Sequence, residues 1–318
     1  MKRYLCWSLA LCMVFSTLLF FPIPSKGESA AQTSVTDKVL RILVLGCDRA
    51  SGLCDTMFIV SVRKSDGRAC ILQIPRDTYA NYTQKSYKKL NGALFSMGAK
   101  GVKDFLAESF GVPIDFFAVL DLDAFTEAVD AVGGVDVDIP REMVYSDPAQ
   151  SLDIHLPAGR VHLNGEMAEQ FVRYRSGYVN ADLGRLDAQK IFLQAFAQKC
   201  GELSSVRLFG VALCMMTRLS TDIGVQHLSD VIGTLRACQG EQIPMATLAG
   251  QAVKGNSGAW YYVINRRGAC DMINEYLMPT TPLTVEAFDP HGVFDRAQNP
   301  NFHNVYQADA QALPLDPP

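Results

Sequence analysis

Three short apolar runs near the start of the chain constrain its fold more than any other feature. Residues 40–45, 57–62 and 69–74 are rich in Ile, Val and Leu, which is typical of buried β-strands. Between the second and third runs lies Lys-Ser-Asp-Gly at 64–67, which has the composition of a tight turn. The last two runs are therefore predicted to pair as an antiparallel hairpin.

Strand-like and helix-like segments alternate along the rest of the chain. Further strands are predicted at 116–120, 135–139, 245–248 and 260–264. Helices are predicted at 89–98, 102–110, 122–132, 165–171, 182–200, 206–219, 225–238 and 269–277. Such alternation indicates an α/β fold. We predict an α-β-α sandwich around a central mixed β-sheet.

The N-terminus carries a separate apolar segment. Lys2 and Arg3 precede an uncharged run at 4–23, and about 20 apolar residues can span a bilayer. Positive charge before the run predicts export of the remaining chain. Because Ser-Ala-Ala at 29–31 is a usable cleavage site, both a transmembrane anchor and a cleaved signal peptide fit the sequence.

The segments predict four regions. Residues 1–24 form the signal anchor or signal peptide, 25–37 a polar linker, 38–278 one exported domain, and 279–318 an irregular tail. Proline, aspartate and asparagine are frequent in the tail, which shows no helical or strand periodicity.

Charge and cysteine usage exclude several classes of protein. The net charge of −4 provides no overall basic field to attract nucleic acid, so an anion site requires a local arginine cluster. The nine cysteines match no small disulfide scaffold, and no Cys/His cluster indicates a zinc site. Cys47 and Cys54 flank a short loop that a disulfide could close.

Two aspartates mark the ends of the first two predicted strands. Asp48 follows the first strand and Asp55 precedes the second, so a hairpin loop between them brings both carboxylates to its mouth. Mg²⁺ is commonly held by one or two carboxylates together with substrate phosphate. Aspartate is also frequent at strand ends for structural reasons, so the pair alone leaves both roles open.

The predicted hairpin about 64–67 adds an arginine to this edge. Its register places Arg76 opposite Asp55, and Pro75 suits the last position of a strand. A surface ion pair is the alternative, and it would contribute little to stability. Two acids and one arginine at one edge favour a metal–phosphate site.

Two later motifs supply further polar residues. If the chain becomes extended near residue 171, Arg173 and Arg175 point to the same side. In the next predicted helix, Asp182, Arg185 and Gln189 are spaced so that they share one face.

The alternative for this helix is an ordinary solvated face. Together with Arg76, however, the two motifs offer four arginines to one site. Guanidinium groups bind phosphate oxygens in a two-pronged manner, which suits a pyrophosphate.

In this order, the motifs resemble the LytR–CpsA–Psr family. Between residues 39 and 200 they read Leu-Gly-x-Asp, Asp-Thr, Ile-Pro-Arg-Asp-Thr, Gly-Gly-Val-Asp-Val, Leu-Asn-Gly-Glu, Val-Arg-x-Arg and Asp-x-x-Arg-x-x-x-Gln. The resemblance implies an α/β sandwich with a deep apolar groove for a polyprenyl chain. It also implies a phosphotransferase that moves an anionic glycopolymer, such as teichoic acid or capsular polysaccharide, from a polyprenyl-pyrophosphate carrier to a peptidoglycan sugar hydroxyl.

The resemblance further implies roles for individual residues. Asp48 and Asp55 would hold Mg²⁺. The pyrophosphate would be bound by Arg76, Arg173, Arg175, Arg185 and Gln189. For such a transfer we assign catalytic roles to Arg76, Asp77 and Asp182, where the choice between the two aspartates as acceptor of the hydroxyl proton stays open. Leu53 and Asp187 stand where the family often has basic residues.

The expected partners are the lipid-linked glycan donor, peptidoglycan and the membrane, but not nucleic acid. The expected location is the cell membrane, with a single span and an extracytoplasmic domain, or the cell wall after cleavage. Two other functions remain open: a lipid-pyrophosphate hydrolase, and a non-catalytic wall-associated binding or regulatory protein.

Overall fold

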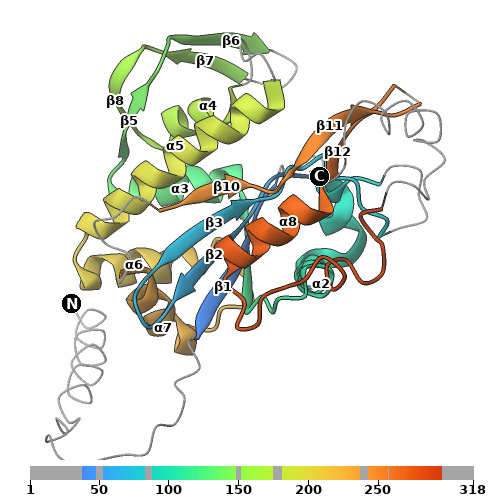
Figure 1. Ribbon diagram of the computed structural model, residues 1–318. Helices are drawn as coiled ribbons and strands as arrows, with labels where there is room; N and C mark the ends of the chain where they lie inside the picture. Colours follow the sequence, from blue (N-terminus) through green and yellow to red (C-terminus); the bar gives the residue numbers. More distant parts are fainter. Residues whose placement is uncertain are drawn as a thin grey trace, which may run out of the picture. The chain divides into compact units, whose positions relative to one another are not determined.

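A six-stranded mixed sheet lies at the centre of the domain (Figure 1). Its strands, in spatial order, are β10 (Met245–Thr247), β3 (Ala69–Gln73), β2 (Cys54–Arg63), β1 (Val39–Cys47), β4 (Phe116–Asp121) and β9 (Ser220–Thr221). The β1–β4 and β3–β10 pairs are parallel, and the other three pairs are antiparallel. The predicted α/β fold with a central mixed sheet is confirmed.

This computed structural model describes residues 38–47, 53–82, 88–147, 152–174, 181–236, 243–256 and 258–295. The chain divides into two units, Met1–Thr36 and Asp37–Pro318, and the described residues belong to the second. Within these ranges no helix is both long and apolar enough to cross a membrane. The predicted anchor or signal segment lies outside them.

Side chains alternate between the two faces of the sheet, as period-2 strands require. On one face, Leu43 and Leu45 of β1 join the main core. The helices α2 (Ala93–Phe110) and α8 (Arg266–Met272) cover this face. On the other face, Ile42 and Val44 line a cavity.

Five of the described helices contribute side chains to the wall of that cavity. They are α3 (Leu122–Val132), α4 (Gly165–Arg173), α5 (Ala181–Glu202), α6 (Ser205–Met215) and α7 (Val225–Arg236). The predicted break between two helices near residue 98 appears as a kink in α2, where Gly98 has a φ of 70°. Asp121 begins α3 by accepting a hydrogen bond from the Ala124 amide, and Gly133 ends it at a φ of 91°.

Four strands that the sequence did not predict belong to three small two-stranded antiparallel sheets. They are β6 (Met143–Asp147), β7 (Leu152–Leu156), β8 (Gly159–Leu163) and β11 (Gly250–Lys254). In these sheets β6 pairs with β7, β8 with β5 (Val135–Ile139), and β11 with β12 (Trp260–Ile264). Side chains from β5 to β8 form a second core with α3, α5 and α4 (Gly165–Arg173).

The segment after the π-helical turn η3 (Ile273–Leu277) is irregular but packs into the main core. Phe288 and Phe294 are almost fully buried, and both rings lie against Phe110 of α2. Asp289 accepts hydrogen bonds from the Val293 and Phe294 amides. The packed domain therefore extends past residue 278 to at least Phe294.

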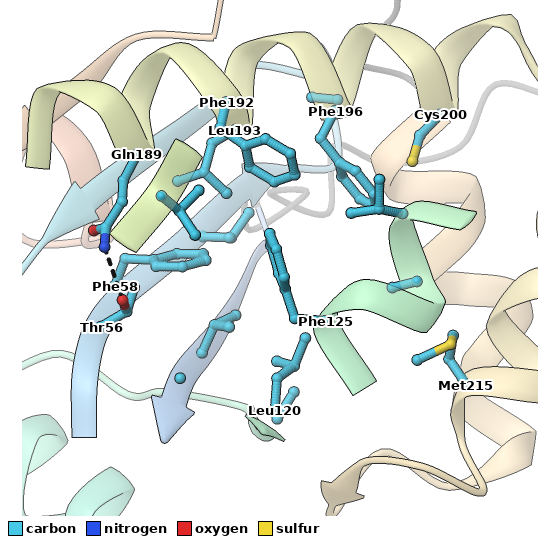
Figure 2. Close-up of a pocket in the computed structure, with 18 of the residues that line it drawn as sticks. Thr56, Phe58, Leu120, Phe125, Gln189, Phe192, Leu193, Phe196, Cys200 and Met215 are labelled. Carbon is cyan, nitrogen blue, oxygen red and sulfur yellow. Dashed lines mark hydrogen bonds between the residues drawn. The ribbon is translucent and has the colours of Figure 1, made fainter. Parts of the chain in front are cut away.

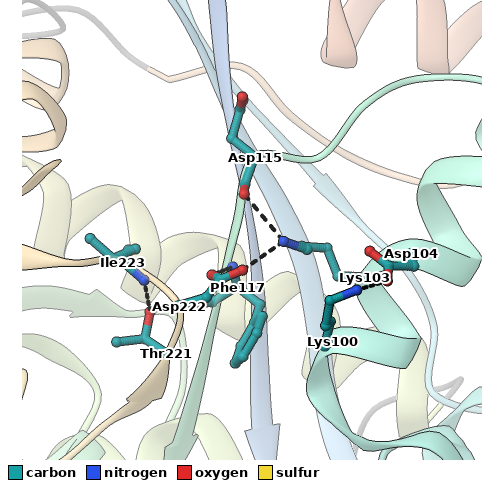
Figure 3. A network of polar contacts seen from close by, with 8 residues as sticks. All are labelled: Lys100, Lys103, Asp104, Asp115, Phe117, Thr221, Asp222 and Ile223. Atoms are coloured by element: carbon teal, nitrogen blue, oxygen red, sulfur yellow. Dashed lines mark hydrogen bonds and ion pairs between the residues drawn. The ribbon is translucent and has the colours of Figure 1, made fainter.

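The short edge strand β9 is fixed by a polar network (Figure 3). Asp222 accepts hydrogen bonds from the Phe117 amide at 2.7 Å and from Lys103 Nζ at 2.6 Å. The neighbouring Lys100–Asp104 pair is largely exposed, with 77% and 54% of the two side chains accessible.

We expect Asp222→Ala to lower the free energy of unfolding by about 1–2 kcal/mol, because it removes the acceptor for two hydrogen bonds. Asp104→Ala is the matched control, with an expected loss below about 0.5 kcal/mol, since exposed helix pairs contribute little. Urea unfolding of both variants measures the difference. Equal losses would show that Asp222 does not fix the edge strand.

Candidate functional site

The site begins at a β-bulge where β2 opens. Gly46 pairs with Thr56, but the next pair along β1 is Cys47 with Cys54, so Asp55 is an extra residue in β2. A bulge turns neighbouring side chains that would otherwise alternate. Asp55 and Thr56 consequently both line the cavity, whereas Cys54 belongs to the opposite core.

Arg76 lies beside this bulge, as the hairpin register predicted. Phe58 pairs with Gln73, the last residue of β3, so the observed register of β2 and β3 is the predicted one. Three residues beyond, Arg76 Nη1 donates a hydrogen bond to the Asp55 carboxylate. The predicted proximity of Asp55 and Arg76 is confirmed, and the same contact is an ion pair with both side chains partly accessible.

The first part of α5 docks on the same bulge. Arg185 Nη1 donates to the backbone carbonyl of Asp55 at 2.8 Å, and Gln189 Nε2 donates to Thr56 Oγ1 at 3.0 Å. Figure 2 shows the second bond at one end of the cavity. Both side chains are almost fully buried, at 2% and 5% exposure, and both line the cavity. In the described part of the chain, Gln189 Oε1 has no hydrogen-bond donor.

Arg173 also lines the cavity, but not in the predicted conformation. The prediction that the chain is extended there is wrong, because α4 continues through Arg173. A hydrogen-bonded pair of Arg173 with Glu169 one turn earlier, at 2.6 Å, stabilises the last turn of this helix. Arg175 lies outside the described residues.

Asp77 is held in an ion pair that the sequence did not reveal. Lys89 Nζ lies 2.7 Å from Asp77 Oδ1, and it also sits 5.3 Å from the centre of the Tyr261 ring. The main chain beside it is tied down too, since the Tyr262 amide donates to the Asp77 carbonyl. Lys89 and Arg76 thus both pair with Asp77, so Lys89 adds a second cation there. The sequence pattern at residue 89 predicted only the start of a helix.

A further carboxylate stands at the end of β4. Asp121 pairs with Cys47 across the parallel β1–β4 ladder and lines the same cavity as Asp55. Because Asp121 lies between a strand and a helix, the sequence indicates an N-cap, and this structural role alone explains an aspartate there. Nothing in the sequence therefore indicated that Asp121 also belongs to the site.

The remaining predicted site residues are only partly described. Asp48 lies outside the described residues, and Asp182 is placed in α5 without a description of its side chain. Among the described side chains, no group of three or more His, Cys, Asp or Glu is arranged to hold a metal ion. Asp187 is exposed and paired with Lys190, away from the cavity lining.

The cavity itself is large and mostly apolar. Its volume is about 1440 Å³, and Phe58, Phe125 and Phe192 are among the side chains that form its walls (Figure 2). Lining residues of α5 run from Arg185 to Glu202, a distance of about 25 Å along the helix. Near the far end, burial raises the pKa of Cys200 to about 11. A long apolar space therefore begins at a polar cluster.

Two thiols lie at the rim of this polar cluster. The sulfur atoms of Cys47 and Cys54 are 3.7 Å apart. Their hydrogen bond lowers the pKa of Cys47, and the same bond together with burial raises the pKa of Cys54.

Comparisons with known proteins agree with this architecture. Residues 24–276 match the LytR_cpsA_psr family. Among curated relatives, the polyisoprenyl-teichoic acid–peptidoglycan teichoic acid transferase TagU of Bacillus mycoides is 28% identical over 259 residues, covering 79% of this chain and 82% of the relative. TagU of Oceanobacillus iheyensis is 27% identical over 252 residues, covering 76% of each chain.

Solved structures share the fold. TagV of B. subtilis superposes with a TM-score of 0.66 at 24% identity, covering 77% of this chain and 99% of TagV. The structure described as TagT bound to LIIa-WTA gives 0.61 at 22% identity, covering 78% and 93%. This chain belongs to the LytR–CpsA–Psr family.

Proposed function

We propose that this protein transfers an anionic glycopolymer of the teichoic acid class from a polyprenyl-pyrophosphate carrier to a sugar hydroxyl of peptidoglycan. The observation that carries this proposal is the long apolar cavity that begins at Arg185 and Gln189. A lipid chain joined to a pyrophosphate is complementary to this cavity. Its apolar chain fits the apolar walls, and its anionic head group fits the end that carries Arg185. The TagU relatives, which are teichoic acid transferases by name, support the substrate class.

The chemistry is a displacement at the glycan-side phosphorus. The acceptor hydroxyl forms a new P–O bond, the bond to the bridging oxygen breaks, and polyprenyl phosphate leaves. Arg185 and Arg173 on the cavity wall, with Arg76 beside Asp55, are placed to neutralise the charge that develops on the leaving phosphate. Arg175 would complete the cluster, and the Gln189 side chain would bind a phosphate oxygen or its water.

The hydroxyl proton needs a carboxylate acceptor, and Asp77 and Asp182 are the two candidates. Lys89 holds the Asp77 carboxylate in place at 2.7 Å, close to Arg76.

The donor atoms present fit Mg²⁺. Asp55 offers a partly accessible carboxylate on the cavity side, Asp121 lies near it, and both supply the oxygen ligands that Mg²⁺ prefers. Asp48 and Asp55 would hold the ion, which when bound supplies positive charge to the phosphate oxygens.

The location follows from the N-terminal run. Residues 1–24 would anchor the chain in the cell membrane or direct its secretion, the linker 25–37 would follow, and the domain from residue 38 would act outside the cytoplasm, where peptidoglycan is exposed. Membrane fractionation and N-terminal sequencing of the mature protein distinguish anchoring from cleavage.

We expect Asp55→Asn to reduce glycopolymer transfer about 10–100-fold, because an amide replaces a charged metal ligand that also orients Arg76. The assay measures glycan transferred from a lipid-pyrophosphate donor to peptidoglycan, with and without a chelator. Added Mg²⁺ should restore chelated unaltered protein but not the variant. Asp138→Asn, an exposed position on β5, serves as the matched control and should behave normally.

Two results would argue for the other functions. Equal release of free glycan phosphate with and without peptidoglycan would indicate a hydrolase. Tight binding of the lipid donor with no product in either case would indicate a binding protein.

A further inference from the structure

Cys47 and Cys54 occupy directly opposed positions at the ends of β1 and β2. Their sulfur atoms lie 3.7 Å apart, and both residues are free thiols in the structure. Cys54 is fully buried in the main core, whereas Cys47 is partly accessible and lines the cavity. The pair thus has one sulfur open to a reagent and one shielded from it.

The ladder pairing of the two cysteines and the separation of their sulfur atoms both suit a disulfide. Directly opposed residues of antiparallel strands have Cα atoms about 4.5–5.5 Å apart. A disulfide requires about 4.4–6.8 Å between Cα atoms and about 2.05 Å between sulfur atoms. Rotation of the two side chains therefore brings the sulfur atoms together while the strand pairing stays as it is.

We propose that Cys47 and Cys54 are a redox-active pair that forms an intramolecular disulfide at the rim of the site. The oxidant is another disulfide, either that of a thiol oxidoreductase or that of a small oxidised thiol. Cys47, losing its proton, attacks one oxidant sulfur, and the other leaves as a thiol. Cys54, losing its proton, then attacks the Cys47 sulfur and displaces the second thiol. Two electrons and two protons pass from the pair to the oxidant, which ends as two thiols.

The bond would tie the strands together at the bulge that carries Asp55. The Asp55 carboxylate accepts a hydrogen bond from Arg76, and the Asp55 backbone carbonyl accepts one from Arg185. A bridge that fixes this end of β2 therefore also fixes the acceptor atoms of both arginines. Bond formation does not depend on the proposed transfer reaction. Its test therefore stands even if that function fails.

The sequence offers a direct readout. Trypsin cleaves after Arg41, Arg49 and Arg63, which places Cys47 on peptide 42–49 and Cys54 on peptide 50–63. The full-length protein is equilibrated with oxidised or reduced glutathione, its remaining thiols are alkylated, and it is digested without reduction. We expect the two peptides to be joined after oxidation and separate, each alkylated, after reduction.

Thermal unfolding supplies a second measurement. A bridge across so short a ring is expected to raise the melting temperature of the oxidised protein by about 5 °C. The Cys47→Ser/Cys54→Ala variant should lose this redox difference, and Cys214→Ser, at an exposed position, should keep it.

Peptides that stay separate under oxidation, or a Cys47 peptide joined to a different cysteine, would overturn the proposal. A joined pair whose melting temperature does not change with redox state would refute the stabilising role. If the double variant does not fold, the peptide linkage in the unaltered protein decides the question.

Discussion

Arg76→Ala is expected to reduce glycopolymer transfer by about 10²–10³-fold, the loss typical when one fixed donor to a developing negative charge is removed. Arg76 is held at the end of β3 by its contact with Asp55, so its position is set before substrate binds. The variant removes this charge and also leaves the Asp55 carboxylate without its arginine. The measurement is the rate of transfer from a lipid-pyrophosphate donor at saturating donor concentration.

Two further variants make the result specific. Arg76→Lys keeps the charge but loses the two-pronged guanidinium geometry, so an intermediate rate is expected. Arg160→Ala removes an arginine whose side chain is 82% exposed on β8, and it should leave the rate unchanged. If Arg76→Ala transfers glycan as fast as the unaltered protein, Arg76 takes no part in the reaction.

The affinity for polyprenyl pyrophosphates is expected to rise at least about tenfold with each added isoprene unit until the cavity is filled. Each buried methylene contributes about 0.8 kcal/mol, so burying only about two of the five carbons of an isoprene unit already gives about 1.6 kcal/mol, or somewhat more than tenfold. Three added units then correspond to at least about a thousandfold. The reason is the apolar wall that follows α5 for about 20 Å from Gln189 to Glu202. Calorimetric titration with carriers of increasing length, at fixed pyrophosphate head group, measures the series.

A matched pair of variants locates the effect in the cavity. Val60 lines the cavity from β2, so Val60→Trp should narrow it and make the affinity level off at a shorter chain. Phe95→Trp changes an aromatic side chain that is 76% exposed on α2, and the series should remain as in the unaltered protein. An affinity that does not vary with chain length would contradict a lipid-binding role for the cavity.

Much of the sheet and part of the site were predictable because local patterns determine them. The turn at 64–67 sets the register of β2 and β3, and that register alone brings Arg76 to Asp55. Helical spacing likewise placed Arg185 and Gln189 on one face of α5, and both line the cavity.

The rest depended on features without a local signal. A bulge adds one residue to a strand without disturbing its apolar character, so the shared orientation of Asp55 and Thr56 was not visible in the sequence. Lys89 and Asp121 reach the site through tertiary contacts made by other segments. Arg173 lines the cavity from a helix rather than from an extended segment, because its pairing with Glu169 one turn earlier stabilises the last turn of α4.

The burial of Phe288 and Phe294 against Phe110 has a consequence for the order of folding. A ribosome delivers β1 to β4 long before it delivers the irregular segment that completes their core. Until that segment emerges, the face of the sheet covered by α2 lacks two aromatic side chains and exposes apolar surface. The nascent domain therefore has to remain incompletely folded, and in need of protection from aggregation, until almost the whole chain has been synthesised.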